Sequence, residues 1–326
     1  MMANLTLVEA VNQALAWEMA HDDSVVVFGE DVGVNGGVFR ATVGLQEKFG
    51  AERVFDTPLA EAMIAGLSVG MATQGFKPVP EIQFMGFIYP ALDQIISHAS
   101  RMRNRTRGRL TCPMVLRAPF GTGIRAPEHH SESTEALFAH MPGVRVVIPS
   151  SPVRAYGLLL SAIRDPDPVV FLEPKRIYRA FRQEVPDNGE GLPLDKAFVT
   201  RPGTDVTLIS WGASALENWN AAGELADEGI DCEVVDLATV SPIDKHTILE
   251  SVSRTGRAVI VHEAAVSGGL GGEVAAILAS EGLYSLEAPV IRVGGYDAVP
   301  PLARMEYGYI PGVQRIKDAV HECMES

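Results

Sequence analysis

Residues 53–84 read RVFDTPLAEAMIAGLSVGMATQGFKPVPEIQF, and this stretch decides the class of fold. It begins with a short apolar run at 53–55, continues with a helical pattern over 60–75 and ends in a second apolar run at 78–84. Strand-length apolar runs separated by a helix-length segment are typical of parallel strands that helices cover on both faces. The stretch therefore predicts two strands of one parallel sheet and the helix between them.

The same alternation extends in both directions from this stretch. Further β-branched runs lie at 25–30, 113–118, 144–149 and 168–173. Helical patterns lie between them, at 90–103 and 152–164, and the apolar residues near the N-terminus also follow helical spacing. The first half of the chain is therefore expected to form an α/β domain around a parallel sheet.

Residues 174–203 interrupt the alternation with prolines and glycines mixed with charged residues, which is typical of a connection between domains. Strand-length apolar runs then return at 206–212, 232–237, 258–264 and 289–293. We therefore expect two α/β domains, a larger one over 1–185 and a smaller one over 204–326, with a linker at about 174–203.

The composition argues against several classes of function. Asp and Glu number 41 against 27 Lys and Arg, and the net charge of −14 has the wrong sign for binding nucleic acid or an anionic membrane. The three cysteines are far apart and form no C-x-x-C pair, which fits a reducing compartment. No apolar stretch reaches the roughly 18 residues of a membrane span, and the start has no signal-peptide pattern. We expect a cytoplasmic protein.

Glu61 is the first candidate site residue. Thr57 and Pro58 have the pattern of a helix cap and a first helical residue, which predicts Glu61 about one turn into the helix. The simplest interpretation is a carboxylate that complements the helix dipole. Its neighbours over 59–65 are mostly apolar, however, and a desolvated carboxyl has the raised pKa that a proton-shuttling acid requires.

Several motifs, in order along the chain, resemble one protein family. They are DTPLAE at 56–61, EIQFMGFIYPALDQI at 81–95, RAPFGTGIRAPEHHSES at 117–133, HMPGVRVVIPSSP at 140–152, LLLSAIRDPDPVVFLEPK at 158–175, EVVDLATVSPID at 233–244 and LEAPVIRV at 286–293. With them the chain resembles, almost from end to end, the β subunits of the E1 component of 2-oxoacid dehydrogenase complexes, in the transketolase-like superfamily. The resemblance implies an α/β pyrimidine-binding domain for thiamine diphosphate, followed by a smaller transketolase C-terminal-like domain.

The resemblance also implies roles around the cofactor. Glu61 would hydrogen-bond the pyrimidine N1′ of thiamine diphosphate, Phe87 would stack on the pyrimidine, and Gln83 would line the same site. His130, rather than His129, matches the histidine that assists acyl transfer to a lipoyl arm. By residue type alone, Phe87 is equally well an ordinary core aromatic, and His130 a solvated or capping histidine.

By the same resemblance, the turn DPDP at 165–168 implies a structural monovalent cation such as potassium. Its ligands would be the side chains of Asp165 and Asp167 and the carbonyl oxygens of Val115 and Ala162, because hard oxygen ligands suit such an ion. Some relatives have Asn where this chain has Asp167. Without the resemblance, aspartate and proline here indicate only a turn.

Two missing motifs define the expected cofactors and partners. The glycine run at 268–272 lacks G-x-G-x-x-G spacing, so we expect a closely packed helix start there and no dinucleotide. The chain also lacks the Gly-Asp-Gly run with which thiamine-diphosphate enzymes hold a divalent metal on the diphosphate. The resemblance therefore implies an α subunit that supplies Mg²⁺ and the diphosphate contacts in an α2β2 heterotetramer, and a lipoyl-bearing E2 acyltransferase as the acyl acceptor.

The expected function is oxidative decarboxylation of a 2-oxoacid, pyruvate first, by an enzyme that is active only with its α subunit. The alternatives are a branched-chain 2-oxoacid or acetoin dehydrogenase β subunit, another transketolase-like enzyme, and a non-catalytic assembly module of the same fold. The presence of both Glu61 and His130 argues against the assembly module.

Overall fold

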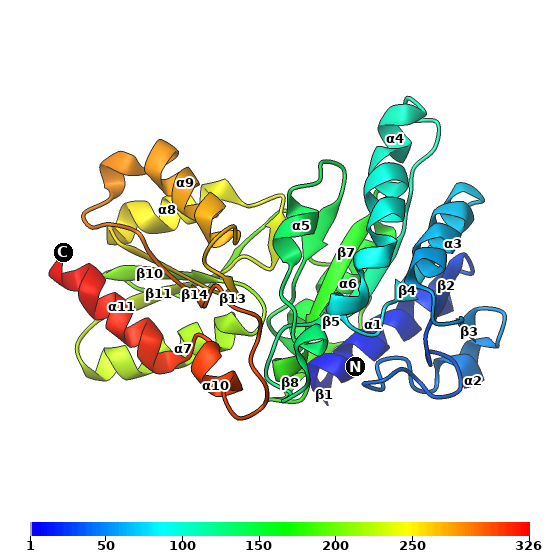
Figure 1. The fold of residues 1–326 in the computed structure, drawn as a ribbon, viewed down its shortest axis with the longest axis horizontal. Helices are drawn as coiled ribbons and strands as arrows, with labels where there is room; N and C mark the ends of the chain where they lie inside the picture. Colours follow the sequence, from blue (N-terminus) through cyan, green and yellow to red (C-terminus); the bar gives the residue numbers. More distant parts are fainter. Residues whose placement is uncertain (1) are drawn as a thin grey trace.

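The computed structural model describes residues 2–326, which form two lobes side by side along the longest axis of the molecule (Figure 1). A seven-stranded sheet forms the centre of the first lobe, and a five-stranded sheet forms the centre of the second. The α/β class predicted from the alternating pattern is confirmed. Within the described residues, no helix has the length and apolar character that crossing a bilayer requires.

The seven-stranded sheet has the order β12-β6-β7-β5-β4-β2-β3, and its neighbours are parallel except β12 with β6. Strands β2, β5 and β7 are buried throughout, which explains why their sequences are mainly apolar rather than alternating, with Arg117 of β5 and Glu173 of β7 as charged exceptions. The strands are β2 Val25–Gly29, β3 Val54–Asp56, β4 Lys77–Glu81, β5 Val115–Phe120, β6 Arg145–Val147, β7 Val169–Pro174 and β12 Thr239–Ser241.

Helices cover both faces of this sheet and bury two separate cores. Val25 and Val27 of β2 pack in one core with residues of α1 and α6, whereas Val26 and Phe28 pack in the other core with residues of α3. The period of two along a strand therefore divides its side chains between the two helical layers. The helices are α1 Leu7–His21, α2 Leu45–Phe49, α3 Glu61–Thr73, α4 Met102–Arg105, α5 Glu135–Ala139 and α6 Pro152–Arg164.

The five-stranded sheet has the order β14-β13-β10-β11-β9, with only β9 antiparallel to its neighbour. Helices α8 and α9 cover one face and α7 and α11 the other (Figure 1). The core beneath α8 and α9 continues into the first lobe. The elements are β9 Phe198–Arg201, β10 Val206–Ser210, α7 Ser214–Asp227, β11 Cys232–Asp236, α8 Lys245–Thr255, β13 Ala258–Ala265, α9 Gly271–Glu281, β14 Ile291–Gly295, α10 Glu306–Tyr309 and α11 Val313–Glu325.

The connection between the lobes is more structured than the sequence analysis expected. Within 174–203, Gln183–Pro186 forms β8, which pairs antiparallel with β1, Met2–Leu5, and β9 joins the second sheet. Strand β12, from the C-terminal part of the chain, pairs with β6 of the first sheet. These short strands pair with partners far away in the sequence, so local patterns do not reveal them. The domain limits 1–185 and 204–326 stay a prediction.

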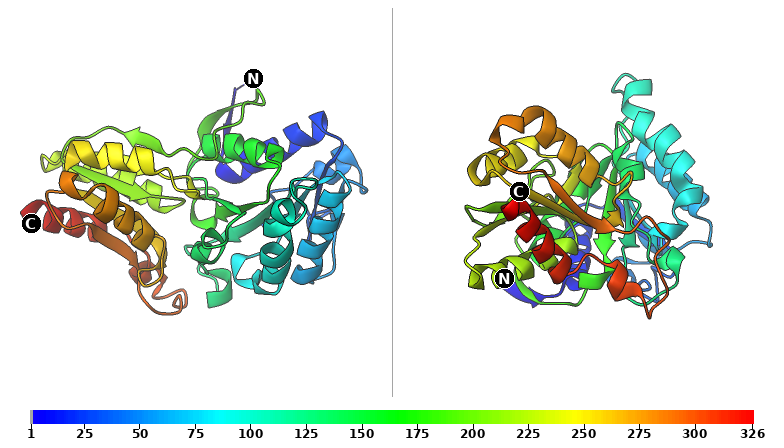
Figure 2. Two further views of the ribbon diagram at one scale, coloured as in Figure 1. Left: turned by 90° about the horizontal axis from the view of Figure 1, so that it is seen from above. Right: turned by 60° about the vertical axis from the view of Figure 1, so that its left-hand side comes forward.

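Figure 2 shows the two lobes from further directions, with the C-terminus at the far end of the second lobe. The lobes meet through buried polar groups as well as through the shared core. Arg154 of α6 pairs with the buried carboxylate of Asp236 at the end of β11, with 3.0 Å between Nε and Oδ2. The junction is thus part of the folded structure and not a loose tether.

Candidate active site

Neighbouring strands of the first sheet end at one common edge. Strands β7, β5, β4, β2 and β3 are parallel, so their carboxyl ends lie along the same side of the sheet. Chain order reverses beside β2, which pairs with both β3 and β4, and open α/β sheets bind ligands at such switch points. The segments that follow these strands carry Glu30, Glu61, Gln83, Phe87, His130 and Lys175.

Glu61 is the first residue of α3, and it is partly buried. The predicted helix start at Pro58, capped by Thr57, is wrong, because the N-cap is Ala60. The backbone N–H of Thr57 donates to the carbonyl of Gly29 at 2.9 Å, which continues the pairing of β3 with β2 and delays the turn into the helix. Glu61 therefore lies in the first turn, where the N–H groups of the helix start have no partner within the helix.

The apolar neighbours that the sequence places around Glu61 do not close over it. Leu59, Met63 and Leu67 are 78%, 41% and 38% exposed, so they form an apolar face along and before α3. Exposed apolar side chains gathered on one element are typical of a surface that another chain covers. Desolvation of Glu61 by its own chain is therefore only partial.

Glu30 is a site residue that the sequence analysis missed. It follows β2 directly, is only 8% exposed, and its Oε1 has no hydrogen-bond partner within the described part of the chain. Burial raises the pKa of the Glu30 carboxyl, and the negative charges of Glu61, Asp31 and Glu81 raise it further. The signal in the sequence is a glutamate at the end of the wholly apolar run VVVFGE.

Gln83 links the segments that follow β2 and β4. Its Nε2 donates to Oδ2 of Asp31 at 2.9 Å. Asp31 has a φ of 57°, a left-handed conformation that aspartate tolerates better than most residues. This turn directs the chain after Glu30 back across the sheet edge, so Glu30, Asp31 and Gln83 lie at adjoining positions.

Phe84, Phe87 and His130 form an aromatic wall at the same edge. The ring centroid of His130 lies 4.4 Å from that of Phe84 and 5.2 Å from that of Phe87. His129 stacks on Phe87, with 5.7 Å between centroids and 17° between ring planes. Gly86 allows this approach, because a Cβ there would lie 2.0 Å from the carbonyl oxygen of His129. Phe87 packs against the core with part of its ring and keeps another part exposed, so its role at the site stays a prediction.

His130 lies beside a buried cation. Lys175, 4% exposed, donates from Nζ to the carbonyl oxygen of His130 at 2.6 Å and lies 5.6 Å from the ring centroid of Phe84. Burial lowers the pKa of the His130 imidazole, the charges of Lys175 and His129 lower it further, and Glu128 opposes them. Nδ1 of His130 is buried and has no hydrogen-bond partner among the described residues. The ring is therefore neutral at neutral pH and able to take up a proton.

A buried ion cluster holds the strands behind this edge. Arg117 of β5 donates from Nε and Nη2 to the carboxylate of Glu173 at 2.6 and 3.0 Å, and from Nη1 to Glu81 at 2.9 Å. The hydroxyl of Tyr178 donates to Glu173 at 2.6 Å. Charge-assisted bonds of this kind fix geometry more strongly than neutral ones. The cluster therefore sets the positions of the ends of β4, β5 and β7.

The two aspartates of the predicted cation turn are paired with arginines. Oδ2 of Asp165 lies 2.8 Å from Nε of Arg145, and Oδ1 of Asp165 accepts the N–H of Asp167 at 2.8 Å. Nε of Arg103 donates to both carboxylate oxygens of Asp167, at 2.8 and 3.0 Å. The guanidinium groups therefore balance the charges that were expected to attract an ion.

The carbonyl ligands expected at this turn come from Val115, at the start of β5, and Ala162, near the end of α6, and both residues are buried. The carbonyl of Ala162 already accepts the N–H of Asp165 at 3.3 Å. The residues that the structure describes contain no group of three or more His, Cys, Asp and Glu side chains able to hold a metal. Both carboxylates of this turn are thus already paired, and the cation stays a prediction.

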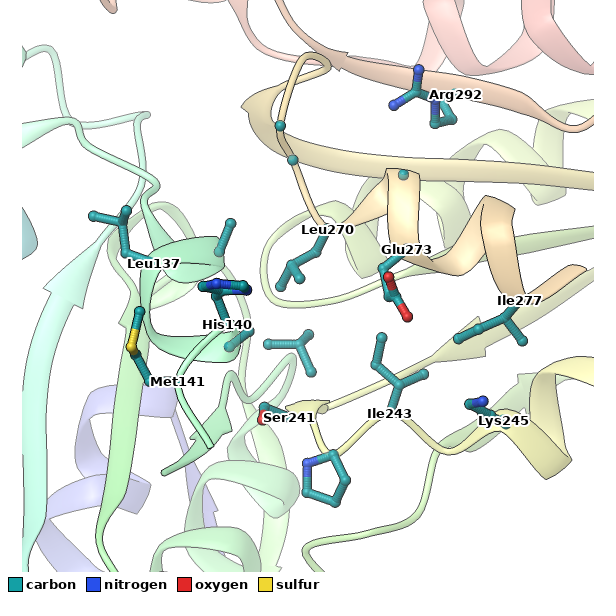
Figure 3. Close-up of a pocket in the computed structure, with 17 residues that line it drawn as sticks. Leu137, His140, Met141, Ser241, Ile243, Lys245, Leu270, Glu273, Ile277 and Arg292 are labelled. Atoms are coloured by element: carbon teal, nitrogen blue, oxygen red, sulfur yellow. The ribbon is translucent and has the colours of Figure 1, made fainter. Parts of the chain in front are cut away.

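A groove of about 860 Å³ lies between the lobes, and no residue predicted for the site lines it (Figure 3). Its walls come from α5, the segment after β12 and the start of α9, and include His140, Met141, Lys245, Leu270 and Arg292. Gly269 of this wall and the nearby Gly271 pack on the buried ring of His262, to which a Cβ would approach within 2.8 and 2.5 Å. The expectation of a closely packed helix start at the glycine run is confirmed.

Comparison with known proteins agrees with this arrangement. Residues 3–180 match the family model described as transketolase, pyrimidine binding domain, and residues 195–316 match transketolase, C-terminal domain. The chain is 53% identical to the pyruvate dehydrogenase E1 component subunit beta of Acholeplasma laidlawii, over 97% of this chain and 96% of that protein. It is 50% identical to the subunit of the same name from Bacillus subtilis (strain 168), over 99% and 100%.

A solved structure described as a split gene transketolase, inactive beta4 tetramer, aligns with a TM-score of 0.81 over 99% of both chains. At 24% sequence identity it supports the fold alone. The family matches and the identities to the two bacterial subunits go further than the fold. The chain belongs to the family of pyruvate dehydrogenase E1 component β subunits, in which a transketolase pyrimidine-binding domain precedes a transketolase C-terminal domain.

Proposed function

We propose that this chain is the β half of a thiamine-diphosphate-dependent enzyme that oxidatively decarboxylates pyruvate and transfers the acetyl group to the lipoyl arm of an E2 acyltransferase. The names of the two bacterial relatives support pyruvate over a branched-chain 2-oxoacid or acetoin. The observation that carries the proposal is the gathering of Glu61, Gln83, Phe87 and His130 along one carboxyl edge of the sheet.

The residues of this edge fit the pyrimidine half of thiamine diphosphate. Glu61 offers a carboxyl group for a hydrogen bond to the pyrimidine N1′, and the partly exposed ring of Phe87 offers a face for stacking. When bound, the cofactor supplies a nucleophilic carbon that attacks the 2-oxo group. Glu61 would hold and return the proton at N1′, and the raised pKa of the neighbouring Glu30 lessens the repulsion from a second carboxylate.

His130 serves the later transfer to the lipoyl group. In that step the carbon of the two-carbon unit would bond to one sulfur of the lipoyl disulfide, and the other sulfur would leave with the electron pair of the broken S–S bond and take up a proton. The same carbon would lose its hydroxyl proton and its bond to the cofactor, whose carbon keeps that electron pair, so that an acetyl thioester is released. The disulfide is thereby the oxidant that the reaction consumes. An imidazole at the edge of the site is suited to carry that proton, because it changes charge near neutral pH.

An α subunit completes the site. We propose that it supplies Mg²⁺ and the diphosphate contacts, because this sequence has no Gly-Asp-Gly run. We further propose that the two subunits form an α2β2 heterotetramer in the cytoplasm. The exposed apolar face formed by Leu59, Met63 and Leu67 supports a partner chain next to Glu61. A cofactor that lies between two subunits explains why this chain carries only residues for the pyrimidine.

Co-expression with the α subunit tests the proposed function. The assembled enzyme is assayed with lipoyl-bearing E2 and with pyruvate, a branched-chain 2-oxoacid or acetoin as substrate. We expect the highest kcat/KM with pyruvate and no turnover without thiamine diphosphate. A higher value for either of the other substrates would reassign the enzyme, and turnover of none of them would refute the proposal.

A further inference from the structure

Residues 121–131, here called the His130 loop, connect β5 to α5 and end in a single 3-10 turn, Glu128–His130. A carboxylate of the second lobe caps the middle of this loop. Glu306, 1% exposed at the start of α10, accepts the backbone N–H of Gly123 at 2.9 Å and that of Arg125 at 3.0 Å. Figure 1 shows α10 at the boundary between the lobes.

A second carboxylate of the same lobe holds the start of the His130 loop. Glu263 of β13 accepts from the backbone N–H of Thr122 at 3.1 Å and from its hydroxyl at 3.2 Å. The other carboxylate oxygen of Glu263 accepts from Nη2 of Arg176 at 2.7 Å. Gly121 has a φ of 83° and no room for a Cβ, which would lie 2.5 Å from Glu263. The backbone itself is therefore the group that the second lobe grips.

Lys175 holds the other end of the His130 loop, through the 2.6 Å bond from its Nζ to the carbonyl of His130. Burial lowers the pKa of Lys175 to about 7, and the charges of Glu263 and Glu306 oppose that change. Glu263 and Glu306 thus accept hydrogen bonds from backbone N–H groups of the loop. Their negative charges also favour the charged form of Lys175, which donates to the carbonyl of His130.

From these contacts we infer that Glu306 of the second lobe and Lys175, which follows β7 of the first lobe, are positioning residues for His130 and together fix the loop that presents the imidazole to the site. The inference rests on the proposed role of His130. Through Glu306 and Glu263, the second lobe would then contribute to catalysis indirectly, by holding the backbone of the His130 loop. A purely structural role for these contacts would change stability without changing the protonation of His130.

The test uses the assembled α–β enzyme with the variants Glu306→Gln, Glu306→Ala and Lys175→Met. The matched control is Asp297→Asn, because Asp297 is another carboxylate of the second lobe that accepts a backbone N–H, from Ser267 at 3.1 Å, and it does not touch the His130 loop. Amide hydrogen exchange over 120–134 reports the order of the loop, and acetyl transfer is measured against pH and against decarboxylation with an artificial electron acceptor.

We expect Glu306→Ala to speed exchange within 121–131 on the order of tenfold, since buried charged hydrogen bonds are lost, with a smaller effect in Glu306→Gln. Both variants should lower kcat for acetyl transfer more than the artificial-acceptor rate. Lys175→Met removes the charge with the largest effect on the pKa of His130, ahead of those of His129 and Glu128, so the acid limb of acetyl transfer should move to higher pH.

Unchanged exchange over 121–131 in both Glu306 variants, relative to Asp297→Asn, would overturn the inference. The inference would also be overturned if Lys175→Met did not shift the acid limb of the pH dependence of acetyl transfer. Because exchange needs no turnover, it decides the inference even if the wild-type enzyme transfers no acetyl group, an outcome that would refute the proposed function separately. Glu306→Gln preserves the shape of the side chain and serves if truncation prevents assembly.

Discussion

Two carboxyl groups at the end of neighbouring strands, Glu30 and Glu61, are the residues whose charges matter most to the proposed chemistry. Burial and three acidic neighbours raise the pKa of Glu30, whereas Glu61 lies at a helix start that is open to a partner chain. Two carboxyl groups in different environments can hold different protonation states at one pH. Glu61 is also the more accessible of the two, so it is the carboxyl group that can exchange a proton with the cofactor.

Replacing Glu61 with Gln should therefore leave folding intact and slow turnover by about 10²- to 10⁴-fold, the range expected when a positioned acid–base group is lost. An amide has the same shape as the carboxyl group but cannot exchange a proton with N1′. Turnover of pyruvate by the assembled enzyme is the measurement, with Glu52→Gln as an exposed control in the same lobe. Activity of the Glu61 variant close to wild type would end its assignment.

His130→Ala should reduce acetyl transfer to E2 more than decarboxylation measured with an artificial acceptor, because only the transfer uses the imidazole. The pKa of His130 is lowered from 6.5, so its neutral form persists to a more acidic pH than in an unfolded chain. The acid limb of wild-type acetyl transfer should accordingly lie below pH 6.5. Equal losses in the two assays would assign the histidine to an earlier step.

Among the elements, β5 depends on an arginine that has no access to water. Arg117→Met would leave Glu81 and Glu173 buried without their counter-charge, and removing one partner of a buried ion pair costs about 3–5 kcal/mol. A denaturation midpoint well below that of the wild type is expected. Arg182→Met, which breaks an exposed pair with Glu9 and an exposed hydrogen bond to the carbonyl of Asn4, is the control and should change little. Equal midpoints in the two variants would show that the cluster is dispensable.

At the turn between α6 and β7, potassium binding is tested by thermal unfolding in KCl and in choline chloride at the same ionic strength. A bound cation stabilises the native state, so the wild type should unfold at a higher temperature in KCl, and the double variant Asp165→Ala, Asp167→Ala should lose that difference. Equal midpoints of the wild type in both salts would mean that Arg145 and Arg103 hold the turn without an ion.

The sequence predicts an element well when residues close together in the chain determine it, and poorly when long-range packing does. The buried strands β2, β5 and β7 and the helix α6 were predicted closely, because apolar runs and a Ser-Pro start act within a few residues. The helix expected over 90–103 occurs as short 3-10 and π-helical turns that lead into α4, since packing against α3 decides its winding. Strands β9 and β12 pair over long sequence distances and leave no local pattern.

The site was predictable to a different extent. Glu61, Gln83, Phe87 and His130 were identified through a family resemblance, and the structure brings the segments that carry them to one edge. Glu30 carries a signal in the sequence, a charge at the end of an apolar strand, but its closeness to Glu61 depends on β2 and β3 being neighbours. The contacts of Lys175 and Glu306 with the His130 loop depend on how the two lobes meet, which no local pattern shows.

For the molecule as a whole, the proposed cofactor site is divided between this chain and an α subunit. The chain offers an edge for the pyrimidine, an exposed apolar face beside it and a net charge of −14, which repels a diphosphate that no metal neutralises. The second lobe completes the edge from within the same chain by holding the His130 loop. The remaining half, a metal and its ligands, is assigned to the α subunit.

Calorimetric titration with thiamine diphosphate and Mg²⁺ tests this division most directly. The isolated chain should show no binding in the micromolar range, and adding the α subunit should restore both micromolar binding and turnover of pyruvate. The isolated chain is first checked for a native circular dichroism spectrum, so that weak binding is not a result of unfolding. Micromolar, magnesium-dependent binding of the cofactor by the isolated chain would contradict the account, because a complete site would then lie within this one sequence.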